Sequence, residues 1–113
     1  MGDPRGRYAA WTQRLVDAVL ATPGHTPSAL RRAALARAAM PGGPADGLPA
    51  PLAGYVDKVA LHAYRVTHDD IAALQRAGRS EDAIFEITVS TAVGAALARL
   101  DRGLAALRGE EPA

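Results

Sequence analysis

The stretch from Thr67 to Ile84 reads THDDIAALQRAGRSEDAI and carries the signals for one complete helix and the start of another. Thr67 and Asp70 have the spacing of a capping box, in which each side chain accepts a hydrogen bond from the other residue's backbone N–H. Gly78 is the residue type that most often ends a helix in the left-handed conformation. Ser80 predicts a second N-cap, and the acidic residues after it suit the positive end of a helix dipole. Two helices joined by a tight turn are therefore predicted.

Apolar residues at helical spacing, separated by Pro/Gly breaks, predict helices elsewhere in the chain. Thr26 is expected to cap the second helix, with Pro27 in its first helical position. Residues 41–51 form a Pro/Gly-rich loop, either a flexible lid or a strap over the core. The expected helices are 4–21 (or 7–21), 27–40, 51–64, 68–77 and 81–107. With no strand pattern or internal repeat, the chain is predicted to be one all-α domain, 1–113, a bundle of about five helices with a core helical hairpin and a long C-terminal helix.

The first and last predicted helices carry distinctive faces. The first has one apolar stripe, formed by Tyr8, Trp11, Leu15, Val16 and Val19. The last has a long apolar face, formed by Phe85, Val89, Ala92, Ala96 and Leu100 and continued by Leu104 and Leu107. Its second face consists of small residues, namely Ser90, Thr91, Gly94, Ala95 and Ala98. Small side chains allow another helix to approach closely, so this second face is expected to be a packing surface.

Composition favours a homo-oligomer that does not bind nucleic acid or membranes. Apolar residues are 49% of the 113, but alanine carries much of that share and aromatics are only 4%. Alanine buries little area, so subunit contacts would add to a modest core. The formal charge of +1 produces no strong field. Residues 1–50 contain six Arg and three Asp, a net charge of +3, and residues 51–113 contain seven basic and nine acidic groups, a net charge of −2. The two halves could therefore form two solvated faces, or the basic half could dock on the acidic half.

Several functional classes lack their signals. The chain has no cysteine, and its three histidines lack metal-ligand spacing, so neither a metal nor a cofactor is expected. The predicted hairpin could imitate a helix-turn-helix, but Glu81, Asp82 and Glu86 would repel phosphate at its second helix. No apolar signal core opens the chain, and no run approaches membrane-spanning length. A cytoplasmic location is expected, and the Arg-, Ala- and Gly-rich composition suggests a bacterial source.

The helix–Ala-Gly–Ser-Glu-Asp-Ala-Ile order resembles the core hairpin of the carboxymuconolactone decarboxylase and AhpD-like alkylhydroperoxidase family, over residues 52–107. The peroxidase branch of that family has a Cys-x-x-Cys pair and a nearby histidine just before the glycine. If that glycine is matched to Gly78, the cysteine positions fall on Ala63 and Val66, and the histidine falls on Asp70. The resemblance therefore implies an oligomeric helical fold without thiol peroxidase chemistry.

The decarboxylase branch implies acid–base chemistry with Glu and His around a pocket. His68 is expected in the first turn of a helix, where the positive end of the dipole would favour the neutral imidazole, and it could act as a base. Glu86 is a second catalytic candidate. Tyr64 and Arg65 are candidate binding residues for a small anionic substrate, although Arg65 could instead pair with Glu86 or Asp57. Each of these residues also has a purely structural interpretation.

Two functional classes stay open from the sequence. The favoured one is a non-catalytic structural or regulatory subunit of an oligomer, formed with itself or with a partner protein. The alternative is a non-thiol enzyme or small-molecule-binding protein with a pocket between the third, fourth and fifth helices. An enclosed cavity that reaches Arg65, His68 or Glu86 would favour the alternative.

Overall fold

The computed structural model describes residues 4–41, 43 and 47–110, and of residues 4–7 only the backbone. Within those residues every regular element is helical, which confirms the predicted all-α class. The elements are α1 (Pro4–Ala21), α2 (Ser28–Ala39), α3 (Ala50–His62), the 3-10 turn η1 (Ala63–Arg65), α4 (His68–Arg76) and α5 (Glu81–Leu107).

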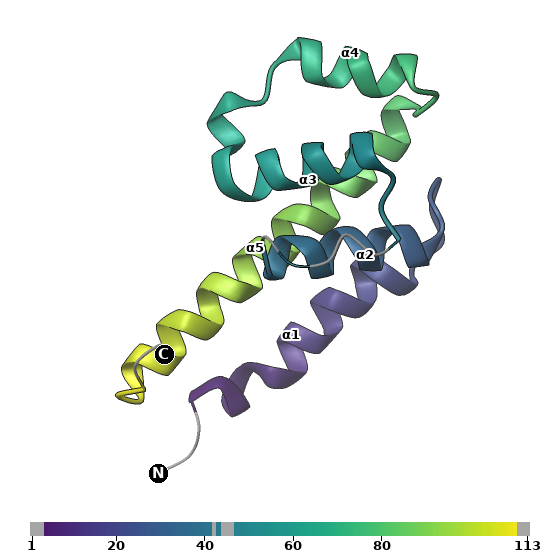
Figure 1. The fold of residues 1–113 in the computed structure, drawn as a ribbon. Helices are drawn as coiled ribbons and strands as arrows, with labels where there is room; N and C mark the ends of the chain where they lie inside the picture. The colour runs from purple at the N-terminus through teal and green to yellow at the C-terminus, as the bar shows by residue number, and fades with distance from the viewer. Residues whose placement is uncertain (1–3, 42, 44–46, 111–113) are drawn as a thin grey trace.

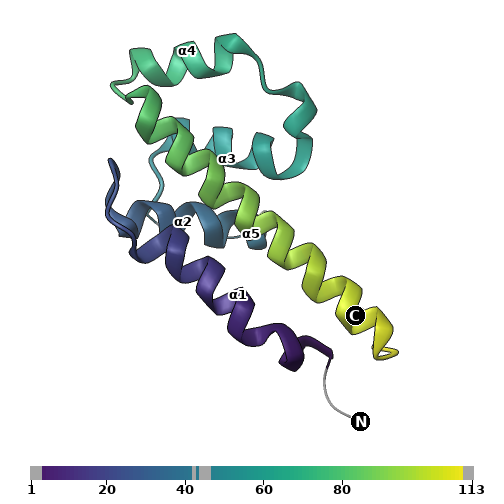
Figure 2. The same cartoon turned by 180° about the vertical axis from the view of Figure 1, so that it is seen from behind.

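Helix α5 is the axis of the fold. Helices α2 and α3 pack on one side of it, and α1 runs beside it in the opposite direction, so that both chain ends lie toward the same end of the molecule (Figures 1 and 2). Helix α4 lies over α3, at the end where α5 begins (Figure 1). The core is the set of buried apolar residues shared mainly by α2, α3 and α5, with Leu52, Val56 and Ile87 almost completely buried.

The contact between α2 and α5 depends on the small residues of α5. At Gly94 an added Cβ would overlap the backbone carbonyl of Leu35 in α2. The neighbouring Ser90 and Thr91 are fully buried, and their hydroxyls donate to the carbonyls of Glu86 and Ile87 one turn earlier, at 2.9 and 2.7 Å. Because those hydroxyls are satisfied within α5, α2 can pack on them without leaving an unpaired polar group. The predicted close-approach face is confirmed, and its partner is α2 of the same chain.

The helical hairpin of residues 67–84 forms as predicted. Thr67 accepts from the Asp70 backbone N–H at 3.4 Å, and the Asp70 carboxylate accepts from the Thr67 N–H at 2.9 Å, which completes the capping box. Gly78 has φ +100°, and the Arg79 and Gly78 amides donate to the carbonyls of Leu74 and Gln75. This is a Schellman ending of the helix. The Ser80 hydroxyl then caps α5 through the Ala83 N–H at 3.1 Å.

The start of α2 differs from the prediction. The residue before the helix is Pro27, which makes no side-chain cap, and α2 begins at Ser28 rather than at 27. Thr26 does not cap this helix, because its hydroxyl instead donates to the Glu86 carboxylate of α5 at 2.6 Å. The Thr26 hydroxyl, which the N-cap preference assigned to the start of α2, is therefore bound to a residue far away in the chain, Glu86.

Both ends of α3 also differ from the predicted bounds of 51–64. The helix spans 50–62, and residues 63 and 64, expected in its last turn, form η1 together with Arg65. Of the predicted loop 41–51, residues 42 and 44–46 lie outside the described part of the chain, so the choice between lid and strap is not addressed. Leu48, near the end of that loop, is buried in the core.

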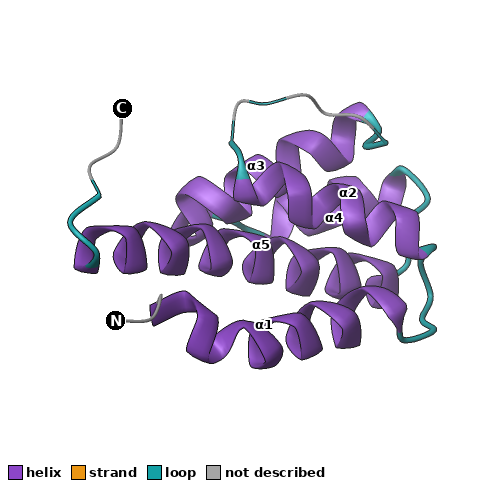
Figure 3. Cartoon of the chain, turned by 90° about the horizontal axis from the view of Figure 1, so that it is seen from below, coloured by secondary structure: helices purple, strands orange, loops and turns teal. Residues whose placement is uncertain are grey.

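Helix α5 corrects one sequence expectation. It has 27 residues, and an 18-residue stretch within it has a mean hydropathy of 1.5, so by length and composition alone it could cross a membrane. The expectation that no segment approaches that length is therefore wrong. Such values are also those of a bundle's core helix, and one face of α5 packs on α2 and α3 (Figure 3).

Candidate functional site

The predicted binding residues lie on the surface around η1. Tyr64 is 78% exposed, and the guanidinium carbon of Arg65 lies 5.6 Å from the centre of the Tyr64 ring. The His62 ring meets the same tyrosine edge-on, with 6.1 Å between ring centres. His68 is exposed at the first residue of α4. These four residues line none of the grooves described below.

Glu86 joins α5 to the α1–α2 connection. Its carboxylate accepts from the backbone N–H groups of His25 and Thr26, at 2.7 and 2.9 Å, and from the Thr26 hydroxyl. Partial burial by itself would raise the pKa of Glu86, but these hydrogen bonds outweigh it and lower the pKa below its ordinary value of 4.5. The ring of the exposed His25 lies 3.7 Å from the Asp82 carboxylate. Glu86 therefore has a structural role as an ionised acceptor.

The structure does not bring His68 and Glu86 together. His68 is the first residue of α4, a nine-residue helix that spans about 13 Å, and Glu86 follows the other end of that helix, in the second turn of α5. The alternative ion pairs predicted for Arg65 do not form either. Asp57 pairs with Arg37 at 2.8 Å, which lowers the pKa of Asp57 through the hydrogen bond from Arg37, and Glu86 is occupied as described. Arg37 also donates a hydrogen bond to the Gly43 carbonyl. Its ion pair with Asp57 links residues 1–50 to residues 51–113.

A groove of about 310 Å³ lies between α3 and α4. Its floor includes the buried Tyr55 and Leu74, and its sides are formed by small or ring residues. Gly54 is one of these, and a Cβ added there would meet nothing within 4 Å. The full lining is Ala50, Pro51, Gly54, Tyr55, Lys58, Asp70, Ala73 and Leu74.

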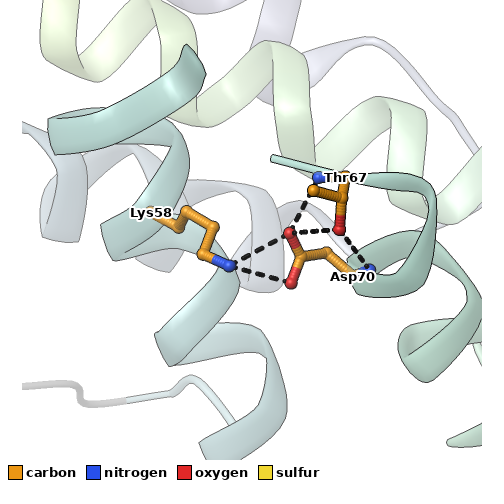
Figure 4. A network of polar contacts seen from close by, with 3 residues as sticks. All are labelled: Lys58, Thr67 and Asp70. Atoms are coloured by element: carbon orange, nitrogen blue, oxygen red, sulfur yellow. Dashed lines mark hydrogen bonds and ion pairs between the residues drawn. The ribbon is translucent and has the colours of Figure 1, made fainter. Parts of the chain in front are cut away.

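The polar part of this groove is a three-residue network (Figure 4). The Lys58 ammonium donates to both Asp70 carboxylate oxygens, at 2.9 and 3.1 Å, while Thr67 donates to one of them from its backbone N–H. The hydrogen bond from Lys58, followed by that from Thr67, lowers the pKa of Asp70 below 3.8. Asp70 is thus an ionised part of the α4 cap, and it forms an ion pair with Lys58 at the polar part of the groove.

Sequence reasoning missed Arg31, which is only 6% exposed. Its Nη1 donates to the carbonyls of Val19 and Thr22 at the end of α1, at 2.9 and 2.8 Å, and its Nε has no hydrogen-bond partner. A cation at the C-terminal carbonyls suits the helix dipole. Arg31 has helical spacing with the buried Ala34 and Ala38, and this spacing was the one available signal.

The neighbouring helices α1 and α5 both carry exposed apolar residues. We name these residues together the α1/α5 face. Trp11 and Phe85 are 65% and 68% exposed, and Leu107 is 77% exposed. A small apolar groove of about 100 Å³, lined by Val19, Phe85 and Val89 among others, joins the two helices at the Phe85 end. The α1/α5 face consists of Tyr8, Trp11 and Leu15 of α1 and Phe85, Val89, Ala92, Ala96, Leu100, Gly103 and Leu107 of α5.

The described His, Asp and Glu residues form no group of three with metal-binding geometry. The described fold and surfaces thus define an all-α helical bundle with exposed apolar residues on α1 and α5 and a groove between α3 and α4. No family model, curated protein or solved structure matches the chain at a significant level. The resemblance to the carboxymuconolactone decarboxylase and AhpD-like family therefore stays an expectation that rests on residues 52–107.

Proposed function

We propose that this protein is a non-catalytic structural or regulatory subunit that associates with copies of itself through the α1/α5 face. The observation that supports this most is the exposed stripe of α5, which lies opposite the face that packs on α2. A helix that is apolar on both sides is normally covered on both sides. Apolar patches of this extent on a soluble protein mark interaction sites.

The distribution of chemistry-bearing residues supports a non-catalytic role. His68, Arg65 and Tyr64 are exposed around η1, whereas Glu86 lies beyond the far end of α4 and is held by Thr26. General acid–base catalysis needs its groups within hydrogen-bond reach of one substrate. The described arrangement offers these four residues no common pocket.

The test compares two matched substitutions at exposed alanines inside helices. Ala96→Glu places a charge on the α1/α5 face, and Ala36→Glu places the same charge on the exposed side of α2. Light scattering should give at least twice the 11.7 kDa chain mass for the unmodified protein and for Ala36→Glu. Ala96→Glu should shift toward 11.7 kDa with its helical circular dichroism retained. A monomeric unmodified protein, or a full-mass Ala96→Glu variant, would overturn the proposal.

The groove between α3 and α4 supports a second candidate function, the binding of a small anionic molecule with an apolar body. Its volume of about 310 Å³ is at the lower end of ligand pockets. Gly54 adds to the case, because a glycine inside a helix costs roughly 0.5–1 kcal/mol relative to alanine and no neighbour here requires it. The glycine keeps one wall of the groove open, and Lys58 lies at its polar part.

Benzoate is a suitable probe of this second function. In an NMR titration, amide shifts should be confined to the groove residues, Gly54, Tyr55, Lys58 and Ala73 among them. Gly54→Leu should fill the groove and abolish the shifts, whereas Ala36→Leu, at an exposed helical position outside it, should leave them unchanged. Shifts that persist in Gly54→Leu would contradict the assignment.

A further inference from the structure

The exposed stripe of α5 has a regular spacing. Its members are Phe85, Val89, Ala92, Ala96, Leu100, Gly103 and Leu107. Phe85, Ala96 and Leu107 are separated by two equal intervals of 11 residues, and each interval is subdivided in the same order. Eleven residues make three turns of nearly ideal pitch, so the stripe runs almost straight along the helix for about 33 Å. A straight, continuous stripe can contact a second helix along its whole length.

The charges of α5 are directed away from this stripe. Glu86 is bound to Thr26, and the Arg99 guanidinium donates to the Ala60 carbonyl of α3 at 3.0 Å. Asp101 and Arg102 line a separate open groove next to Ala39 of α2. Covering the stripe from Phe85 to Leu107 therefore leaves Glu86 and Arg99 with the partners that they have within the chain.

The α1/α5 face is large enough for a second copy. An aromatic residue buries roughly 150–250 Å² when fully covered, and Trp11 and Phe85 each expose about two thirds of their surface. With the leucines and alanines between them, the face is on the order of the roughly 800 Å² that each partner buries in a standard interface. The shape agrees, because the Cα radius of gyration is 15.2 Å, whereas a compact domain of this length has about 13 Å.

Side-chain sizes along the stripe indicate its orientation. If two stripes are antiparallel and centred on Ala96, Val89 lies opposite Gly103 of the second copy and Ala92 opposite its Leu100. Phe85 then lies opposite Leu107 at each end, and the two Ala96 residues meet at the centre. The two inner pairs thus set a larger residue against a smaller one, the arrangement in which facing layers interdigitate, while the large Phe85 and Leu107 meet at the two ends. A parallel pair would instead place each residue opposite itself, so that Phe85 crowds Phe85 and Gly103 leaves a gap.

We propose that two copies of this chain pack α5 against α5 in antiparallel orientation, with the two-fold axis at Ala96 and the exposed flanks of both α1 helices beside the contact. This inference rests on the proposed self-association and adds its surface and register. An antiparallel contact of identical surfaces is the closed arrangement of a two-fold dimer. It also opposes the two helix dipoles, which a parallel pair would align.

Single-cysteine cross-linking tests the register, because the chain has no cysteine of its own. The reagent is a bismaleimide that spans the usual distance between helix axes, about 8–10 Å. In Ala96→Cys the two thiols should lie within its reach. In Gly103→Cys, on the same stripe, they should be about 20 Å apart. Ala96→Cys should therefore form linked dimers on the order of 100-fold faster than Gly103→Cys, because its partner thiol is held at a far higher effective concentration.

A mixture of Val89→Cys and Gly103→Cys subunits should give the linked heterodimer, because these positions are opposite each other. Each variant is first checked by light scattering. A dimer in which Gly103→Cys links to itself as fast as Ala96→Cys would overturn the antiparallel register but leave self-association intact. A dimeric Ala96→Cys variant that does not link would do the same. A monomer, including one that binds vesicles of phosphatidylcholine and phosphatidylglycerol through this face, would overturn both proposals.

Discussion

At the scale of single residues, the glycines of this chain serve different purposes. Gly94 is required by the fold, because a Cβ there would overlap the Leu35 carbonyl of α2. Gly54 has open space around the same position, although it too lies inside a helix. The same substitution should therefore have opposite effects at the two sites.

Gly94→Ala should destabilise the protein by about 1–3 kcal/mol, the usual range for overpacking, because α2 must move away from α5. Gly54→Ala should stabilise it by about 0.4–1 kcal/mol, since alanine restricts the unfolded chain without meeting a neighbour. Urea unfolding of the two variants measures both effects. Equal stabilisation by both would show that α2 does not approach α5 as closely as described.

Glu86 should make folding sensitive to acid. Its pKa is lower in the folded state than in the unfolded chain, so its contribution to stability is complete above about pH 4.5 and is lost as the pH falls through the folded-state value. Glu86→Gln should lower the melting temperature near neutral pH, and its difference from the unmodified protein should shrink as the pH falls below 4.5. Glu81→Gln, at an exposed position of the same helix, is the control. A Glu86→Gln deficit that does not change with pH would contradict this role.

At the scale of elements, the parts of the fold that local rules govern could be predicted from the sequence. The caps at Thr67, Gly78 and Ser80 depend on residues within a few positions of each other, and all three form. The role of Thr26 could not be predicted, because its acceptor Glu86 is 60 residues away. Arg31 was missed for the same reason, since its partners are the carbonyls of another helix.

The α4 cap gives the element-scale prediction. Thr67→Ala removes the hydroxyl that accepts from the Asp70 N–H and should cost about 1 kcal/mol, the typical loss of an N-cap. Thr67→Ser keeps an equivalent acceptor and should retain most of the stability. Thermal unfolding by circular dichroism checks both. If alanine were as well tolerated as serine, Asp70 and Lys58 alone would hold the start of α4.

At the scale of the whole molecule, the residues expected to form one site do not lie together in the structure. The sequence predicted one candidate site formed by His68, Arg65, Tyr64 and Glu86. These residues are near each other in the chain and lie within the stretch that resembles a known family. In the structure, Tyr64 and Arg65 of η1 and His68 at the start of α4 lie toward one end of α4, whereas Glu86 lies past its other end. The groove beside α4 is lined by Lys58 and Asp70 instead. The apolar stripes of the first and last helices were visible in the sequence. Which parts of them stay uncovered depends on where α2 and α3 pack, which periodicity alone does not determine.

If a second copy covers the α1/α5 face, Trp11 should report directly on that contact. It is the chain's single tryptophan and is 65% exposed in one protomer. Acrylamide quenching of its fluorescence should be well below that of the unfolded protein at high concentration, and should rise on dilution as subunits separate. Quenching close to that of the unfolded chain at every concentration, with native circular dichroism, would show that the face stays open and would contradict the account.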